Sequence, residues 1–575
     1  MRTSQTIKEK KHEYLVLKSF KGINTQPSRE ALSEDEFAWL ENAMPTGNAF
    51  LQVVPALAAA TATVTSSIQL MHFASIGTVN YQICFTNAGG AQAVNLGNGS
   101  VVTIAAGGTF STPSMDQWKT ERIVIGDKSN GFFSWDGTLF YQPGSMATIS
   151  VTVSGSAYTS TPSVVLTGGT AGTTAVATAT LVSGGVSSIT LSNLGTGYTA
   201  APAVSFSGGT TATVGLATAT AFIMPTGQNA DAVAVYSGRV WLGQNRTLNY
   251  TAPNTWFDFA AGDAAGATTI TEGSLRQKIY GLEALDNYLY VMGDSSIIII
   301  GDLKVTGSIT TFSQTFLSST TGTTLPATIT AMERAILFMN KYGVYALFGA
   351  SVQKISKGLD GIFPLIDFTQ NISAGLVQIY NQLCYAVSFT YMDTNANRVL
   401  QAVFFDGKWF LTSQGALTYI APASINGVLS LWGTTGTDVR QLYGDTISNI
   451  SSKIQTGLLD LGNPIFDKQM NRAALEFTST AIASMTLEVD TEKTKQTQTL
   501  TGGNTIVWTN NNNVPMVWQN NSAQTITWIA TGFLSLSALY DLVGKYIGFT
   551  ATSTSPAVVV NGFLAEYQQR ASWGP

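Results

Sequence analysis

Short apolar strands recur along most of the chain, each followed by a polar turn and a second apolar or aromatic strand. From Val240 onward the spacings between successive first strands are 49, 47, 48 and 45 residues, and the first spacing along the chain is 41. A period in the forties that carries about four short strands is typical of a β-propeller blade. The pattern therefore predicts an all-β protein built on a β-propeller of six or seven blades. The first strands begin at Tyr81, Arg122, Val240, Leu289, Ile336, Cys384 and Leu429.

One interval is too long for a single blade. Arg122 and Val240 are 118 residues apart, which is one period plus roughly 70 extra residues. Within the extra segment "GSAYTSTPSVVLTGG" matches "GTGYTAAPAVSFSGG" at an offset of 40, so that Tyr158 pairs with Tyr198. Each copy continues into a Thr/Ala stretch with strand-like alternation. We expect residues 151–222 to form an inserted β domain of two 40-residue units rather than a flexible linker.

After residue 456 the pattern changes again. Trp508, Trp518 and Trp528 lie ten residues apart with Asn-rich turns between them, which predicts a three-stranded meander with the indole rings on one face. These rings could form a core or a ligand platform. Residues 456–575 are expected to form a separate sandwich-like β domain.

The amino-terminal stretch "FKGINTQPSREALSEDEFAWLENAM" carries a different signal. Ser33 and Glu36 have the spacing of a helix capping box, and Glu34 and Asp35 are favourably placed for a helix start. Residues 1–60 are therefore expected to be a polar arm with one short capped helix. The propeller is then discontinuous, with residues 61–150 and 223–455.

Composition narrows the functional classes. Charged residues make up 11% of the chain, against about 25% in an average soluble protein, and the net charge is -5. Such a chain lacks the basic footprint of a nucleic-acid clamp. The arm nevertheless holds a group of lysines, which could be a solvated tail or a docking site for an acidic partner. These are Lys8, Lys10, Lys11, Lys18 and Lys21.

The chain offers little catalytic chemistry. With two histidines and with Cys84 and Cys384 as its two cysteines, no metal site, disulfide framework or histidine-based triad is expected. Both cysteines are interpreted as small buried apolar residues. Most carboxylates occupy turn positions such as Asp136-Gly137. The strongest local apolar run, "SIIIIGD", is too short to span a bilayer. We expect a non-enzymatic protein without cofactors or membrane spans.

Three stretches carry a resemblance to a known family. "GINTQPSREALSEDEFAWLENAM" is similar to the start of the tail nozzle proteins of short-tailed bacteriophages (podoviruses), where a "GG(I/L)NTQ" arm precedes a short capped helix ending in "LxN". The family is also called tail tubular protein B or packaged-DNA stabilisation protein. "NKYGVYALFGASVQKISKGLDGIF" looks like a second family stretch, and "GFLAEYQQRASW" resembles the terminal strand. The segment "AFLQVVPALAAA" departs from the family, because it lacks the basic, glycine-containing strand that usually follows.

The resemblance implies a structural virion protein of the distal tail, assembled in the host bacterial cytoplasm. Six copies would form a ring below the portal and adaptor (the head-to-tail connector) and beside tail fibres or spikes. Double-stranded DNA would pass through the ring without sequence-specific binding, be retained, and be released on infection. Besides the lysines, candidate partner contacts are Phe37 and Trp39 in the arm and Tyr158 and Tyr198 in the insert.

Two alternatives stay open from the residues. The first is a receptor-binding or glycan-binding propeller at the tail tip, with aromatic platforms such as Tyr158, Tyr198, Trp508 and Trp518. The second is a propeller scaffold unrelated to virions.

Overall fold

The computed structural model describes residues 12–47, 49–209, 215–318, 320–479, 483–502, 534–556 and 558–570, together with four two-residue strands between 508 and 526. Within these residues the regular structure consists of β-strands and five short 3-10 turns, without an α-helix. The 3-10 turns are η1 (Arg29–Ala31), η2 (Ala261–Asp263), η3 (Pro326–Thr328), η4 (Lys357–Leu359) and η5 (Phe363–Leu365). The expected all-β class is confirmed.

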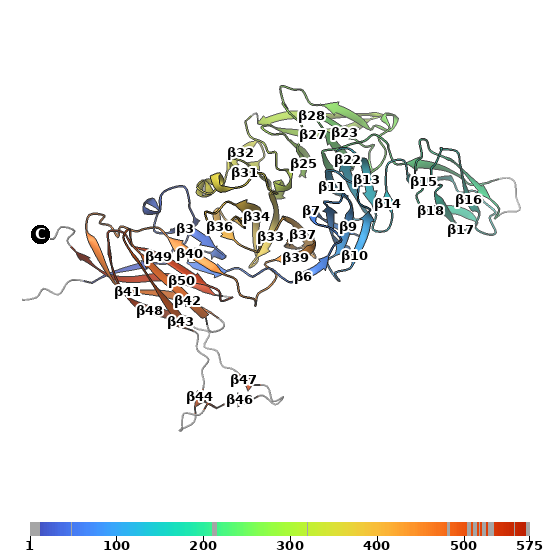
Figure 1. The fold of residues 1–575 in the computed structure, drawn as a ribbon. Coiled ribbons are helices and arrows are strands. Elements are labelled where there is room, and N and C mark those ends of the chain that lie inside the picture. Colours follow the sequence, from blue (N-terminus) through green and yellow to red (C-terminus); the bar gives the residue numbers. More distant parts are fainter. Residues whose placement is uncertain are drawn as a thin grey trace, which may run out of the picture.

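Seven four-stranded antiparallel units in the described chain form a β-propeller (Figure 1). Blades 1 to 3 comprise β7 (Ile68–Ile76), β8 (Val79–Thr86), β9 (Ala91–Asn95), β10 (Val101–Ala105); β11 (Pro113–Trp118), β12 (Arg122–Asp127), β13 (Gly131–Trp135), β14 (Phe140–Tyr141); and β21 (Ala232–Tyr236), β22 (Arg239–Gln244), β23 (Thr247–Tyr250), β24 (Gly266–Thr269). Blades 4 and 5 comprise β25 (Gly281–Leu285), β26 (Tyr288–Met292), β27 (Ile297–Thr306), β28 (Ile309–Ser318); and β29 (Thr330–Met332), β30 (Ala335–Asn340), β31 (Gly343–Phe348), β32 (Ser351–Lys354). Blades 6 and 7 comprise β33 (Ser373–Ile379), β34 (Gln382–Tyr391), β35 (Arg398–Phe405), β36 (Lys408–Thr412); and β37 (Tyr419–Ile425), β38 (Val428–Thr434), β39 (Asp438–Leu442), β6 (Ala60–Thr63).

The second strand of each blade explains the sequence period. This strand lies inside its sheet and packs on neighbouring blades through both faces, so it reads as an uninterrupted apolar run rather than an alternating one. In β12, for example, Ile123 and Ile125 pack towards blade 1, whereas Val124 packs towards blade 3. The seven predicted repeat starts fall on these seven second strands, which decides between six and seven blades.

The ring of blades closes with a strand from the beginning of the propeller segment. β6 pairs antiparallel with β39, so that Asp438 lies opposite Thr63 and Val439 opposite Ala62. The innermost strands contact one another in the order β7, β11, β21, β25, β29, β33 and β37, and β37 contacts β7 again. Closure by a distant strand leaves the ring without an open end.

The insert leaves the propeller between blades 2 and 3 (Figure 1). It is one six-stranded sheet in the order β15, β20, β19, β16, β17 and β18. Its strands are β15 (Met146–Val153), β16 (Ser163–Thr167), β17 (Val176–Val182), β18 (Gly185–Asn193), β19 (Ala203–Ser207) and β20 (Thr218–Ile223). Two small cores lie around Tyr158 and Tyr198, and each combines residues from both sequence copies.

A β-sandwich lies on the other side of the propeller (Figure 1) and contains strands from both ends of the chain. Its amino-terminal strands are β1 (Glu13–Leu17), β2 (Gly22–Ile23), β3 (Glu36–Glu41), β4 (Ala43–Thr46) and β5 (Phe50–Val53). Its later strands are β40 (Ser452–Thr456), β41 (Asp467–Thr478), β42 (Ala483–Asp490), β43 (Lys495–Gly502), β48 (Leu534–Gly544), β49 (Gly548–Ser553) and β50 (Val559–Arg570). The expectation that residues 1–60 form a separate arm is therefore wrong, because most of this segment is part of the sandwich.

The predicted helix after Ser33 is also wrong. Its capping-box residues form a turn, in which the N–H of Glu36 donates to the Ser33 carbonyl at 3.1 Å and the Ser33 N–H reaches Glu36 Oε2 at 3.4 Å. β3 follows immediately and buries Phe37 and Leu40. Pairing of β3 with β40 and β36 gives these apolar side chains a long-range core that a short isolated helix lacks.

The predicted tryptophan meander is described only in part. Trp508–Thr509 (β44) pairs with Pro515–Met516 (β45), and Trp518–Gln519 (β46) pairs with Thr525–Ile526 (β47). Trp528 lies outside the described residues.

Candidate assembly site at the propeller–sandwich joint

The arm that carries "GINTQ" lies in a seam between the propeller and the sandwich. The Thr25 N–H and Oγ1 both donate to the Gly358 carbonyl in η4, at 2.6 and 3.1 Å. Ile23 is buried there, as are Leu359 and Ile362. The segment just after β32 of blade 5 therefore holds the arm.

Glycines allow the two backbones to approach this closely. A Cβ on Gly361 would lie 2.1 Å from the Thr25 carbonyl oxygen, and one on Gly358 would lie 2.9 Å from the Ile23 oxygen. Gly22 has φ +115°, and a Cβ there would lie 2.8 Å from the Trp409 oxygen. Side chains at these positions would push the arm off blades 5 and 6.

Arg29 in η1 fastens the same arm to the sandwich. Its guanidinium makes a two-pronged contact with the Asp490 carboxylate at the end of β42, with Nη2 and Oδ1 3.0 Å apart. Arg29 Nε also donates to the Thr456 carbonyl of β40 at 2.9 Å. Planar double contacts of this kind fix orientation as well as distance.

Asn42, in the stretch "LENAM", ties three segments together. Its Nδ2 donates to the Ser451 carbonyl at 2.7 Å, and its Oδ1 accepts the Ser413 N–H at 2.8 Å. The residue is 1% exposed and adopts φ 56°, a conformation that asparagine tolerates better than most residues. Asn42 thus joins the end of blade 6 to the start of β40 in the sandwich.

The joint is continuous in sheet and in core. The blade 6 sheet β33–β36 extends through β3 into β40, β49, β42 and β43. A single apolar cluster likewise runs from Leu337 and Val403 in the propeller, through Phe20 and Phe37, to Leu475 and Phe563 in the sandwich. This continuity stabilises the propeller and the sandwich as one unit.

The remaining predicted contact residues are dispersed. Lys18 pairs with Glu476 at 2.7 Å and Lys21 with Asp35 at 2.8 Å, whereas Lys8, Lys10 and Lys11 lie outside the described residues. Phe37 is buried against Phe20, so in this chain it is a core residue.

Trp39 is half-buried: its Nε1 donates to Glu41 at 2.8 Å and its ring lies 5.4 Å from the Arg398 guanidinium carbon. Tyr158 and Tyr198 are 5% and 2% exposed. Neither tyrosine has a free ring face to offer as the expected contact platform, because both belong to the cores of the insert.

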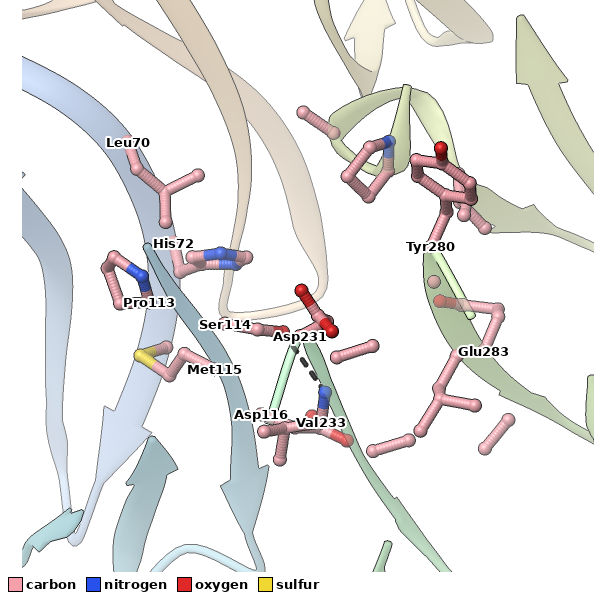
Figure 2. Close-up of a pocket in the computed structure, with 18 of the residues that line it drawn as sticks. Leu70, His72, Pro113, Ser114, Met115, Asp116, Asp231, Val233, Tyr280 and Glu283 are labelled. Atoms are coloured by element: carbon pink, nitrogen blue, oxygen red, sulfur yellow. Dashed lines mark hydrogen bonds between the residues drawn. The ribbon is translucent and has the colours of Figure 1, made fainter. Parts of the chain in front are cut away.

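Inside the ring, polar groups from different blades face a central cavity of about 400 Å³ (Figure 2). His72 comes from β7, Asp116 from β11 and Glu283 from β25, while Asp231 immediately precedes β21. Asp116 accepts the N–H groups of Val235 and Gln117, both at 2.6 Å, and Asp231 pairs with Lys278 at 2.8 Å. Glu283 also lines a second cavity of about 310 Å³, so it lies between the two.

Burial is the main cause of the pKa shifts of Glu283, Asp116 and His72 in the central cavity. It raises the pKa of Glu283 to about 8, with a further contribution from the Asp116 charge, and the pKa of Asp116 to about 6. The same loss of hydration lowers the pKa of His72 to about 4. These groups were not predicted from the sequence, although single charged residues within otherwise apolar strands such as "GLEAL" were the available signal.

The described residues contain no group of three or more His, Cys, Asp or Glu side chains arranged to hold a metal ion. Cys84 and Cys384 are buried, as expected, and burial raises the pKa of both thiols. In the described part of the chain no helix has the length and apolar character needed to cross a membrane.

Comparison with known proteins adds fold relatives only. No family model and no curated protein matches the chain. The RRP9 WD40 repeats align at 11% identity over 68% of this chain and 99% of theirs, with a TM-score of 0.36. BamB from Moraxella catarrhalis aligns at 14% identity over 66% of this chain and 96% of its own, with a TM-score of 0.32. These values carry no argument about function.

Proposed function

We propose that this chain is a structural protein of the virion tail, the distal nozzle of a short-tailed bacteriophage. One observation carries the proposal: the three stretches that resemble the nozzle family are far apart in sequence but meet around one joint. The "GINTQ" arm packs on "KISKGLDGIF" through Thr25 and Gly358, and "GFLAEYQQR" in β50 pairs with β1 just before the arm. Three family-like segments that meet at one joint are expected if the family uses this joint to hold the propeller and the sandwich together.

In this role the joined propeller and sandwich would act as one wall segment of a ring. Six copies, each contacting the next through two different surfaces, would close around a DNA channel that continues from the portal and adaptor. Passing DNA would meet a wall of low charge density. This would favour sliding, because each contact between a basic side chain and a DNA phosphate adds affinity. The insert would face outward, towards fibres or spikes. This role is non-catalytic and places the protein in the virion, after assembly in the host bacterial cytoplasm.

Immunogold labelling of intact particles with antibodies against this chain tests the proposal. Gold confined to the distal end of a short tail is the expected result. Gold along fibres or over the capsid would contradict the proposal. It would also be contradicted if particles in which mass spectrometry detects the chain bound no gold with any of the antibodies. Antibodies against the insert and against the sandwich should be used separately, because one of these surfaces could be covered in the particle.

A further inference from the structure

A pocket of about 750 Å³ lies where the insert meets blades 2 and 3. Its wall comes from three separate parts of the chain. Blade 2 contributes Arg122 at the start of β12 and the turn around Asp136, the insert contributes Thr148 and the outer strand β18, and the loop after β23 contributes Trp256. The volume falls within the range of about 300–1,000 Å³ that is common for ligand sites.

Arg122 is the notable group in this pocket. Its guanidinium carbon lies 4.0 Å from the centre of the Trp256 ring and 5.0 Å from that of Tyr141. Its Nε and Nη1 are buried without a hydrogen-bond partner among the described residues, and the guanidinium also forms a side-chain hydrogen bond with Tyr141. No carboxylate of the described residues pairs with Arg122 within 4.0 Å, so its charge is uncompensated. A stacked cation with unused donors is costly to keep unless another group completes it.

The rest of the lining is polar in a complementary way. Asp136 accepts the N–H groups of Thr138 and Leu139, at 2.9 and 2.7 Å, and the Tyr141 hydroxyl at 2.8 Å. Among the described residues its second oxygen accepts the tyrosine alone, which leaves a lone pair for another donor. Four residues that carry hydroxyl groups line the wall as well: Thr138, Thr148, Thr190 and Ser192.

We propose that this pocket binds an acidic saccharide, with the sugar carboxylate on Arg122 and sugar hydroxyls on Asp136 and the Thr/Ser wall. A plain inorganic anion fits less well, because it offers no hydrogen-bond donor to the Asp136 carboxylate and most of the volume would stay empty. A neutral sugar would leave the Arg122 donors unpaired. A ligand that carries one acidic group on a polyhydroxyl frame would pair with Arg122 and also donate hydrogen bonds to Asp136. This proposal is independent of the nozzle assignment.

Titration calorimetry on the full chain tests it with three probes: a disaccharide of uronic acid units, the corresponding neutral disaccharide, and acetate. The uronic disaccharide should bind saturably, and the other two should bind at least about tenfold more weakly, since a charge-assisted contact or the hydroxyl contacts are lost. Acetate or the neutral disaccharide binding as tightly as the uronic disaccharide would overturn the proposal, as would no binding of the uronic probe.

Variants locate the site. Arg122→Met keeps a stem on Trp256 but removes the charge, and it should weaken the uronic disaccharide about tenfold or more. Arg246→Met is the matched control, because Arg246 lies on blade 3, pairs with Glu272 at 3.5 Å and does not line the pocket. Loss of binding in the control alone would overturn the assignment.

A second pair keeps the test valid if Arg122→Met fails to fold. Thr190→Trp adds an indole at an exposed position of β18 that lines the pocket, whereas Ser188→Trp adds one at an exposed position of the same strand that does not. Binding should be lost in Thr190→Trp and retained in Ser188→Trp. Full binding in Thr190→Trp would exclude this pocket as the site.

Discussion

Arg29 and Asp490, 461 residues apart in sequence, form a two-pronged ion pair between the arm and the far end of β42. Their side chains are 22% and 13% exposed, so water screens the pair only partly. The pair and the Arg29 contact to the Thr456 carbonyl hold the arm between the two sheets of the joint.

Arg29→Met should lower the free energy of unfolding by about 2–4 kcal/mol, because it leaves the Asp490 carboxylate half-buried without its partner. Arg246→Met, which breaks a pair with a mostly exposed glutamate, should cost less than about 1 kcal/mol. Denaturant unfolding of the two variants checks the difference. Equal effects would show that the arm contact contributes no more than a surface pair.

Asn42→Ala should be more damaging than the same change at another asparagine of similar backbone conformation. Asn42 has φ 56° and makes two side-chain hydrogen bonds, whereas Asn426 has φ 52° in an exposed hairpin turn. Both variants incur a backbone cost of about 1 kcal/mol, and Asn42→Ala adds about 2–3 kcal/mol for the unpaired Ser451 and Ser413 groups. Thermal unfolding compares them, and similar melting temperatures would contradict the role of Asn42 at the joint.

The Glu283 carboxyl group in the central cavity should make the free energy of unfolding fall as the pH rises. Its pKa is about 8 in the folded chain against an ordinary value of 4.5, because burial and the Asp116 charge outweigh the N–H of Ala331. Between these values the unfolded chain releases a proton that the folded chain keeps, so the stability contributed at low pH is lost as pH approaches 8.

Glu283→Gln removes this linkage, so it should stabilise the protein by about 1–3 kcal/mol at pH 8 and change little near pH 4.5. Unfolding measured at both pH values is the check, with Glu121→Gln, a change at an exposed glutamate, as the control. A stability difference that does not change with pH would contradict the folded-state proton.

A mutation in one copy of the insert should destabilise a strand of the other copy. Tyr198, in the second copy, accepts the N–H of Ala175 at 2.8 Å, and Tyr158, in the first copy, accepts the N–H of Ala217 at 2.9 Å. Each tyrosine thus fixes the Thr/Ala strand of the other copy. Tyr198→Phe should cost about 1 kcal/mol and speed amide exchange at Ala175, not at Ala217, whereas Tyr158→Phe should do the reverse. Hydrogen exchange with mass spectrometry distinguishes the two variants. Faster amide exchange confined to the copy that carries the mutation would contradict these contacts between the copies.

The blade period was predictable because strands such as β12 and β22 are buried on both faces and therefore appear as plain apolar runs. The arm was not, because Ser33 and Glu36 form a local signal that helices and turns share. What decides between them is β40, whose partner residues in β3 lie more than 400 positions earlier. The Arg122 pocket was equally hidden, since blade 2, the insert and blade 3 each supply part of its wall.

Both covalent connections between the propeller and the sandwich leave from blade 7. The segment before β6 and the segment after β39 run side by side, with Ala58 donating to Gln441 at 2.9 Å and Ala56 to Asp445 at 2.7 Å. During synthesis the ring therefore stays unfinished until β39 has emerged and can meet β6. A force applied along the chain would reach the ring at this blade 7 seam, whereas the shared sheet through β3 and the arm contacts hold the sandwich to blades 5 and 6.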